Sequence, residues 1–226
     1  MVSVITCTIR EQMLVHIIAN FQRQTVEEKE LIIILNKNDI NVEVPQGQNI
    51  RVFQLDEART LGECLNFGTA LARYDVVAKF DDDDYYSPIY LANSLGLMKE
   101  TKAGVVGKAA IFVYFKKEQL LALFRPQMTN YFVKKELLAG GTLIFKKEVW
   151  EKVPFRPLNV GEDAQFQKDC LARNISLYSG SFQDYVLIRY QEGHQHSWKV
   201  DDGAFQKRCQ RIAVTEAFED YVGGER

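Results

Sequence analysis

Four consecutive aspartates, Asp81 to Asp84, follow an apolar segment in the sequence VVAKFDDDDYYSP. Neighbouring carboxylates repel one another, and this repulsion is poorly screened beside a buried strand. A hard divalent cation relieves it, because Mg²⁺ and Mn²⁺ accept carboxylate and phosphate oxygens as ligands. The run therefore indicates a cation site at the end of a strand, with a solvated acidic turn as the alternative.

Two other kinds of acidic site fit this run poorly. An EF-hand loop that began at Asp81 would need glycine at its sixth position and glutamate at its twelfth, where the chain has Tyr86 and Ala92. A phosphatase that forms an aspartyl phosphate would have threonine or valine where Tyr85 stands, and its motif would follow the first strand.

A second acidic pair, Glu162 and Asp163, opens a predicted helix in GEDAQFQKDCLAR. Acidic residues in a first helical turn are stabilised by the helix dipole, so a purely structural role is one interpretation. The pair also follows the segment AGGTLIFKKEVW, and a Gly-Gly-strand-helix segment before a Glu-Asp pair is a recurring arrangement. Asp163 is therefore a candidate for chemistry as well.

The elements that must position these acids alternate between strand and helix in the first half of the chain. Apolar and β-branched runs predict strands, and apolar residues at helical spacing predict helices between them. This order is typical of a parallel sheet covered by helices, whose ligands gather at the carboxyl ends of the strands. The predicted strands are 2–8, 29–35, 49–55 and 75–80, and the predicted helices are 10–24, 61–74 and 89–100. The second half adds shorter strands and helices, and we expect one mixed sheet overall.

In this order the motifs resemble those of the inverting glycosyltransferases of family 2, which have the GT-A fold. The most specific parts are the aspartate run and the preceding helix with Asn66, Gly68 and Ala72, and the similarity covers most of residues 1–190. The resemblance implies an α/β, Rossmann-like fold with a mixed, mainly parallel central sheet and helices on both faces. It also implies one domain, 1–226, with a nucleotide-binding half (about 1–100), an acceptor-binding half (about 101–200) and a C-terminal helix (201–226).

The resemblance further implies a nucleotide-diphospho-sugar donor and a bound Mn²⁺ or Mg²⁺ ion. Asp81 and Asp83 take the positions of the metal-binding motif, and Asp81, Asp82 and Asp84 those of donor contacts. Asp163 falls on the family's general base, which takes the proton of the attacking acceptor hydroxyl.

The first strand end, TCTIRE, should border the base and ribose of the donor. Thr6, Thr8 and Arg10 are the candidates there, and Arg59 is a candidate for the base or a phosphate. The family usually has acidic residues after the second strand, where this chain has Asn36 in LNKND. We favour a uridine donor, with thymidine as the second choice.

The segment RYQEGHQHSWK contains His194 and His196. Two local ligands without a nearby cysteine make a zinc site improbable. The resemblance implies a loop that folds over the donor, where either histidine would contact the metal or the pyrophosphate. A surface loop is the alternative.

Composition excludes several function classes. The formal net charge is −2 and no basic cluster is interleaved with aromatic residues, so we expect no nucleic-acid partner. No apolar run approaches the length of a membrane span, no signal peptide is evident, and the four cysteines are far apart. We expect a reduced, cytoplasmic setting, with peripheral membrane contact left open.

The resemblance implies a metal-dependent, inverting transfer of a sugar from a nucleotide donor to a glycan or polysaccharide precursor, of the kind used for bacterial spore-coat or surface polysaccharides. One alternative is a sugar nucleotidyltransferase, which would have a glycine-rich loop after the first strand, but TCTIREQ has no glycine. The other alternative is a binding or structural protein that keeps the fold without the chemistry.

Overall fold

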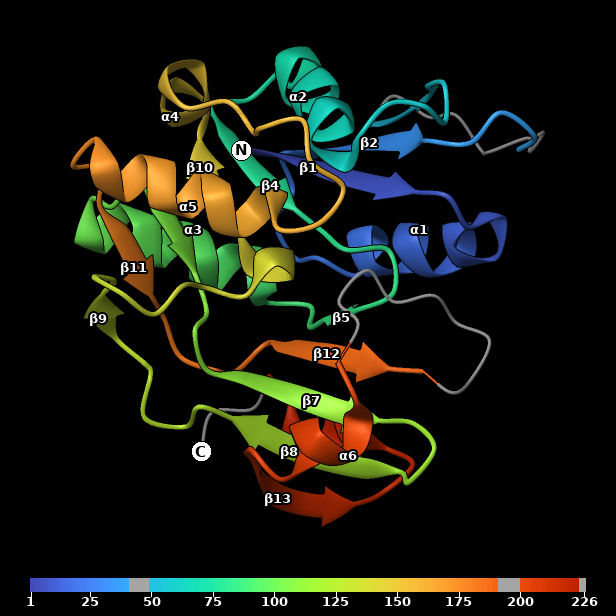
Figure 1. Cartoon of the computed structure of the whole chain (residues 1–226), viewed down its shortest axis with the longest axis vertical. Helices are drawn as coiled ribbons and strands as arrows, with labels where there is room; N and C mark the ends of the chain where they lie inside the picture. The colour runs from blue at the N-terminus through green and yellow to red at the C-terminus, as the bar shows by residue number, and fades with distance from the viewer. Residues whose placement is uncertain (41–48, 191–199, 224–226) are drawn as a thin grey trace.

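The computed structural model describes residues 1–40, 49–190 and 200–223. Its strands form a central sheet of eight strands and a second sheet of five, which lie one above the other in Figure 1. The central sheet has the order β3-β2-β1-β4-β10-β6-β11-β9. Its strands are β1 (Val2–Thr8), β2 (Lys29–Leu35), β3 (Ile50–Gln54), β4 (Val76–Lys79), β6 (Val105–Gly107), β9 (Tyr131–Phe132), β10 (Ile144–Lys146) and β11 (Leu177–Ser179).

The central sheet is parallel at its heart and becomes mixed toward β9. Strands β1, β2, β3 and β4 pair in parallel, whereas β10 runs antiparallel to both β4 and β6. Alternate residues of β2 enter opposite cores: Leu31 and Ile33 pack on one face, and Ile32 and Ile34 on the other. All four are fully buried, as expected of a strand covered on both sides.

Helices cover both faces of this sheet, as the family resemblance implies. On one face pack α1 (Leu14–Gln22) and α3 (Tyr90–Thr101), through residues such as Phe21 and Leu91. On the other pack α2 (Leu61–Leu71), α4 (Lys147–Lys152) and α5 (Glu162–Ala172), through residues such as Leu65 and Phe166. The described residues also include the short 3-10 helices η1 (Glu11–Met13), η2 (Gly140–Thr142) and η3 (Phe218–Tyr221).

The second sheet has the order β13-β8-β7-β12-β5 and lies below the central sheet in Figure 1. One of its faces packs against residues of the main core and the other forms a smaller core of its own. Its strands are β5 (Tyr85–Tyr86), β7 (Ile111–Phe115), β8 (Leu120–Phe124), β12 (Tyr185–Arg189) and β13 (Cys209–Val214). Since β5 follows the aspartate run directly, this sheet holds the far end of the acidic segment.

Two expectations about the second half are wrong. The strands form two sheets and not one, because β7, β8, β12 and β13 pair with each other and not with β6 or β11. Residues 201–226 do not form one helix: the described part contains α6 (Asp202–Gln206), then β13, then η3. β13 pairs antiparallel with β8, and this edge pairing outweighs local helix propensity.

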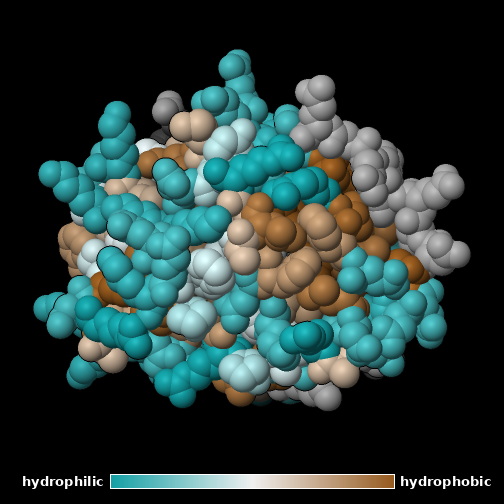
Figure 2. Space-filling model, turned by 90° about the horizontal axis from the view of Figure 1, so that it is seen from above, coloured by the Kyte–Doolittle hydropathy of each residue, from teal (hydrophilic) through white to brown (hydrophobic). Residues whose placement is uncertain are grey.

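Figure 2 shows the molecule from above, where hydrophilic side chains surround a compact group of hydrophobic ones. On α2, the exposed side of the helix carries Phe67, which is 37% exposed and contacts the Phe53 ring edge to face. In the part of the chain that the structure describes, no helix is both long and apolar enough to cross a membrane.

Candidate active site

A cavity of about 500 Å³ lies between the two sheets and is lined by both of them. Residues at the carboxyl ends of β1 and β4 line one side, and residues of β7, β8 and β12 line the other. We name it the inter-sheet cavity. Its acidic residues are Asp81, Asp82, Asp83, Asp84, Glu162 and Asp163, and its basic residues are Arg10, Lys79, Arg125, Arg189 and Arg208.

The end of β1 and the aspartate run meet at this cavity, as the sequence predicts. The Thr8 hydroxyl donates to Oδ2 of Asp82 at 2.5 Å, and the Arg10 Nε–H donates to the same oxygen at 3.0 Å. Nη2 of Arg10 also lies 3.0 Å from Oδ2 of Asp83. Burial lowers the pKa of Arg10, but the hydrogen bonds and charge of Asp82 outweigh it, so the net shift is upward. Arg10 therefore holds two of the four aspartates.

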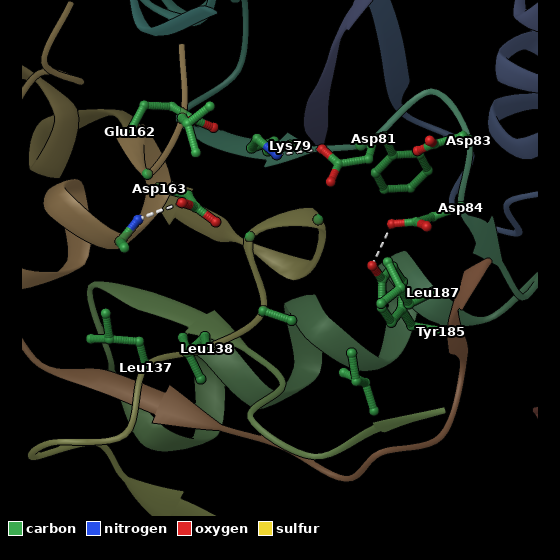
Figure 3. Close-up of a pocket in the computed structure, with 18 of the residues that line it drawn as sticks. Lys79, Asp81, Asp83, Asp84, Leu137, Leu138, Glu162, Asp163, Tyr185 and Leu187 are labelled. Atoms are coloured by element: carbon green, nitrogen blue, oxygen red, sulfur yellow. Dashed lines mark hydrogen bonds and ion pairs between the residues drawn. The ribbon is translucent and has the colours of Figure 1, made fainter. Parts of the chain in front are cut away.

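Asp84 is almost completely buried, with 1% of its surface exposed. Its Oδ2 accepts a hydrogen bond from the Tyr185 hydroxyl (Figure 3), and its Oδ1 accepts one from the Ile188 N–H at 3.1 Å. Burial raises the pKa of Asp84 well above its usual range, and the charges of Asp83 and Asp81 raise it further. A cation near this carboxylate would be strongly favoured.

Lys79, the last residue of β4, is a site residue that the sequence interpretation missed. Its ammonium group forms an ion pair with Asp81, and it is only 5% exposed. Burial lowers its pKa, but the charges of Asp81, Glu162 and Asp163 outweigh burial and raise it overall. Figure 3 shows Lys79 between Asp81 and Glu162. The available signal was a lysine within an otherwise apolar strand, since lysine is rarely buried without a partner.

The Gly140-Gly141 turn of η2 brings the two acidic segments together. A Cβ built on residue 140 would overlap the Asp163 carboxylate, so this carboxylate rests directly on the glycine. A Cβ on residue 141 would lie 2.8 Å from Oδ2 of Asp81 and 2.9 Å from Oδ2 of Asp84. The absence of side chains at these two positions therefore lets three carboxylates approach the same turn.

The two acids at the start of α5 differ in burial. Glu162 is 4% exposed, and burial raises its pKa to about 7, with the Asp163 charge adding to the effect and Lys79 opposing it. Asp163 lines the inter-sheet cavity, and its Oδ1 accepts a hydrogen bond from the Ala164 N–H at 2.6 Å. In Figure 3, Glu162 and Asp163 lie across from Asp83 and Asp84.

Four predicted residues, Thr6, Thr8, Asn36 and Arg59, do not line the inter-sheet cavity themselves, although Thr8 bonds Asp82, which does. Thr6 is fully buried in β1, with no hydrogen-bond partner for its hydroxyl, so the prediction that it borders the nucleotide is wrong. Asn36 donates to the Asp56 carbonyl at 2.8 Å, and Arg59 forms an ion pair with Glu63 at 3.0 Å. Nucleobase contacts by Asn36 and Arg59 stay predictions, and His194 and His196 lie outside the described residues.

The fit of a divalent cation follows from the donor atoms present. Within residues 1–40, 49–190 and 200–223, no group of three His, Cys, Asp or Glu side chains is arranged to hold a metal ion. The oxygens of Asp81 and Asp84 nevertheless face the same small space beside Gly141, and burial raises the pKa of both carboxyls. Hard carboxylate oxygens that repel each other in a buried place suit Mg²⁺ or Mn²⁺.

Comparison with known proteins decides the family. The model of glycosyl transferase family 2 matches residues 3–146, which include β1, the aspartate run and the Gly-Gly turn. The chain belongs to glycosyl transferase family 2. This family 2 chain is 28% identical over 160 residues to the O-antigen biosynthesis glycosyltransferase WbnJ of Escherichia coli. The match covers 66% of the chain and 63% of WbnJ, so the chain spans less than two thirds of that relative.

Solved structures show that the family 2 chain has the GT-A fold. It superposes on residues 1–349 of S. aureus TarS in complex with UDP-GlcNAc with a TM-score of 0.66 and 18% identity, over 92% of this chain and 64% of that one. It superposes on the mannosyltransferase PcManGT from Pyrobaculum calidifontis, in complex with GDP-Man and Mn²⁺, with a TM-score of 0.61 and 15% identity, over 85% and 58% of the two chains.

Proposed function

We propose that this family 2 chain is a metal-dependent, inverting glycosyltransferase that moves a sugar from a nucleotide-diphospho-sugar to a hydroxyl of a glycan or polysaccharide precursor. The observation that carries the proposal is the inter-sheet cavity, which unites the aspartate run with Asp163 in a chain of this family. A sugar nucleotidyltransferase gains no support, since the match is to a glycosyltransferase family.

The residues of the chain have separate tasks in this proposal. Asp81 and Asp83 would hold Mn²⁺ or Mg²⁺, and the bound ion would stabilise charge on the departing nucleoside diphosphate. Asp163 accepts the proton of the acceptor hydroxyl while that oxygen attacks the anomeric carbon, and the configuration at that carbon inverts. Asp163 sits at the N-terminus of α5, where the glycine turn fixes its carboxylate against the backbone.

Uridine diphosphate is the donor nucleotide that we favour, with thymidine diphosphate second. TarS binds UDP-GlcNAc and PcManGT binds GDP-Man with Mn²⁺, so related folds accept different bases. The end of β1 carries Thr8 and Arg10, and the Asn36 N–H donates to the Thr8 carbonyl at 2.9 Å. Thr8, Arg10 and Asn36 thus form one sheet edge that a nucleoside can contact.

We also propose a reduced, cytoplasmic setting, with peripheral contact to a membrane if the acceptor is lipid-linked. All four cysteines are free thiols. Burial raises the pKa of Cys64 to about 11 and that of Cys170 to about 12, which makes both unreactive. The name of WbnJ supports a role in the assembly of a bacterial surface polysaccharide.

Calorimetric titration of the purified protein tests the proposal. UDP, dTDP, GDP and CDP are added with and without Mn²⁺, to the wild type and to Asp83→Ala. We expect one nucleotide to bind, only with metal, and the variant to lose this binding. Asp75→Ala is the matched control, because Asp75 is an exposed aspartate just before β4, at the opposite end of that strand from the cavity.

Two results would oppose the proposal. If no nucleotide binds to the folded wild type, a structural or binding role is favoured and the aspartates are a solvated turn. If a nucleotide binds equally well without metal and to Asp83→Ala, the metal assignment is wrong even though the donor class stands.

A further inference from the structure

Arg125 and Arg208 meet at one end of the second sheet because of strand register. β8 ends at Phe124 and β13 begins at Cys209, and these two residues are partners in the antiparallel pair. Arg125 follows the first and Arg208 precedes the second, so the next cross-strand position holds two arginines. Residues opposite each other in such a pair lie close together.

Both guanidinium groups lie over the same aromatic ring. The Cζ atom of Arg125 is 4.8 Å from the centroid of the Phe124 ring, and that of Arg208 is 5.2 Å from it. All three residues line the inter-sheet cavity. Two positive charges that share one ring repel each other, and an anion between them would relieve the repulsion.

These two arginines differ from the other basic residues of the inter-sheet cavity. Arg10, Lys79 and Arg189 each form an ion pair with an aspartate. Among the residues that the structure describes, Arg125 and Arg208 form no ion pair. Arg125 also has a φ of 53°, in the left-handed region that side chains other than glycine rarely adopt. Such strain is common where a side chain is aimed at a ligand.

We propose that Arg125 and Arg208 bind a phosphate group on the acceptor. This inference rests on the proposed transfer reaction, since it names the acceptor class. Two guanidinium groups match the charge and the oxygens of a phosphate better than those of a single carboxylate. The pair lies at the end of β8 and β13 in the second sheet, whereas the donor contacts proposed above lie at the ends of β1 and β4 in the central sheet. Arg10 already supplies positive charge beside those contacts.

The test measures binding of glucose 6-phosphate, with glucose as its uncharged counterpart and glucuronate as the carboxylate counterpart. The titrated proteins are the wild type, Arg125→Gln, Arg208→Gln and the double variant. Each is titrated once alone and once after saturation with UDP and Mn²⁺. The control is Arg211→Gln, because Arg211 is exposed on the same strand, β13, and does not line the cavity. Circular dichroism checks folding, and the exposed Arg208 provides a variant that leaves the core untouched.

We expect glucose 6-phosphate to bind more tightly than glucose or glucuronate, and the double variant to weaken this binding about tenfold. The double variant should bind UDP as tightly as the wild type does. Arg211→Gln should bind both glucose 6-phosphate and UDP as tightly as the wild type does. The proposal is wrong if glucose or glucuronate binds as tightly, if the variants keep their phosphate affinity, or if UDP affinity falls equally, which would assign the arginines to the donor. The titrations without UDP test the arginine pair on its own. Failure of the protein to bind UDP would therefore count against the glycosyltransferase proposal and not against the phosphate site.

Discussion

Helices α2 and α5 both begin with acidic residues, but the two N-termini use them in opposite ways. At α2, Thr60 and Glu63 form a capping box: each side chain bonds the backbone N–H of the other. At α5, the N-cap is Gly161 with a φ of 78° and no side-chain cap, and Glu162 and Asp163 turn to the inter-sheet cavity.

The pKa values of the two glutamates show which physical effect dominates at each end. The helix dipole favours a charged carboxylate at both N-termini. Hydrogen bonds from the Thr60 N–H and hydroxyl lower the pKa of Glu63, in agreement with that effect. Burial raises the pKa of Glu162 to about 7, so desolvation outweighs the dipole there. Glu63 therefore caps its own helix, whereas Glu162 and Asp163 line the inter-sheet cavity.

Among the changes that test this comparison, Asp163→Asn should have the largest effect, which is on turnover. It keeps the size of the side chain but removes the proton acceptor, so we expect turnover to fall by roughly 10²- to 10⁴-fold with unchanged UDP affinity. Asp169→Asn on the same helix is the control, because Asp169 pairs with Arg156 away from the inter-sheet cavity. Unchanged turnover in Asp163→Asn would show that the α5 acids are structural, like Glu63.

A smaller effect is expected from Gly140→Ala, which moves the Asp163 carboxylate without changing it. The new Cβ would overlap that carboxylate, and a displacement of about 1 Å can reduce turnover by roughly 10²-fold. Gly96→Ala is the matched control, because nothing lies within 4 Å of its Cβ in α3. This control should raise the free energy of unfolding by about 0.5–1 kcal/mol. Equal turnover in the two variants would mean that the glycine turn does not position Asp163.

The central sheet and the second sheet differ in how far the sequence could predict them. Strands β1 and β2 are buried on both faces, so continuous apolar runs identified them correctly. The family resemblance placed the aspartate run and the Glu-Asp pair at one site, and both line the inter-sheet cavity. Thr6 was misplaced: it lies on the same face of β1 as Thr8 but inside the strand, and Thr8 at the strand end is the threonine that bonds Asp82.

The second sheet could not be predicted in the same way. β13 is an edge strand whose pairing with β8 is a contact between distant parts of the chain, and its own residues are mostly exposed. The pairing of Arg125 with Arg208 depends on that register and leaves no local pattern. Lys79 was visible as a lysine in an apolar strand, but two of its three charged partners come from the distant start of α5.

The pH dependence of stability tests whether burial determines the pKa of Glu162. Its pKa is about 7 in the folded protein and 4.5 ordinarily, so the folded state binds the proton more tightly. The group therefore stabilises the fold at low pH, and this contribution is lost as pH rises through about 7. Between pH 5 and 8, the free energy of unfolding of the wild type should fall by roughly 2 kcal/mol relative to Glu162→Gln.

Urea denaturation of both proteins at several pH values measures this difference. Glu148→Gln is the control, since the Glu148 side chain is 61% exposed on α4 and its loss should leave the pH profile of the wild type unchanged. Parallel profiles for the wild type and Glu162→Gln would contradict the burial argument, because they would mean that folding leaves the pKa of Glu162 unchanged.

The smallest effect is expected at the other helix, from Thr60→Ala. The substitution removes the hydroxyl that accepts a hydrogen bond from the Glu63 N–H at 3.3 Å, and the loss of such a cap costs about 1 kcal/mol of stability. Thr25→Ala, at an exposed threonine, is the control and should change stability little. Turnover at a temperature well below unfolding should be equal in both variants. Thr60→Ala could instead reduce turnover by more than its loss of stability explains. The start of α2 would then take part in the reaction, and the contrast between the capped start of α2 and the cavity-lining start of α5 would be wrong.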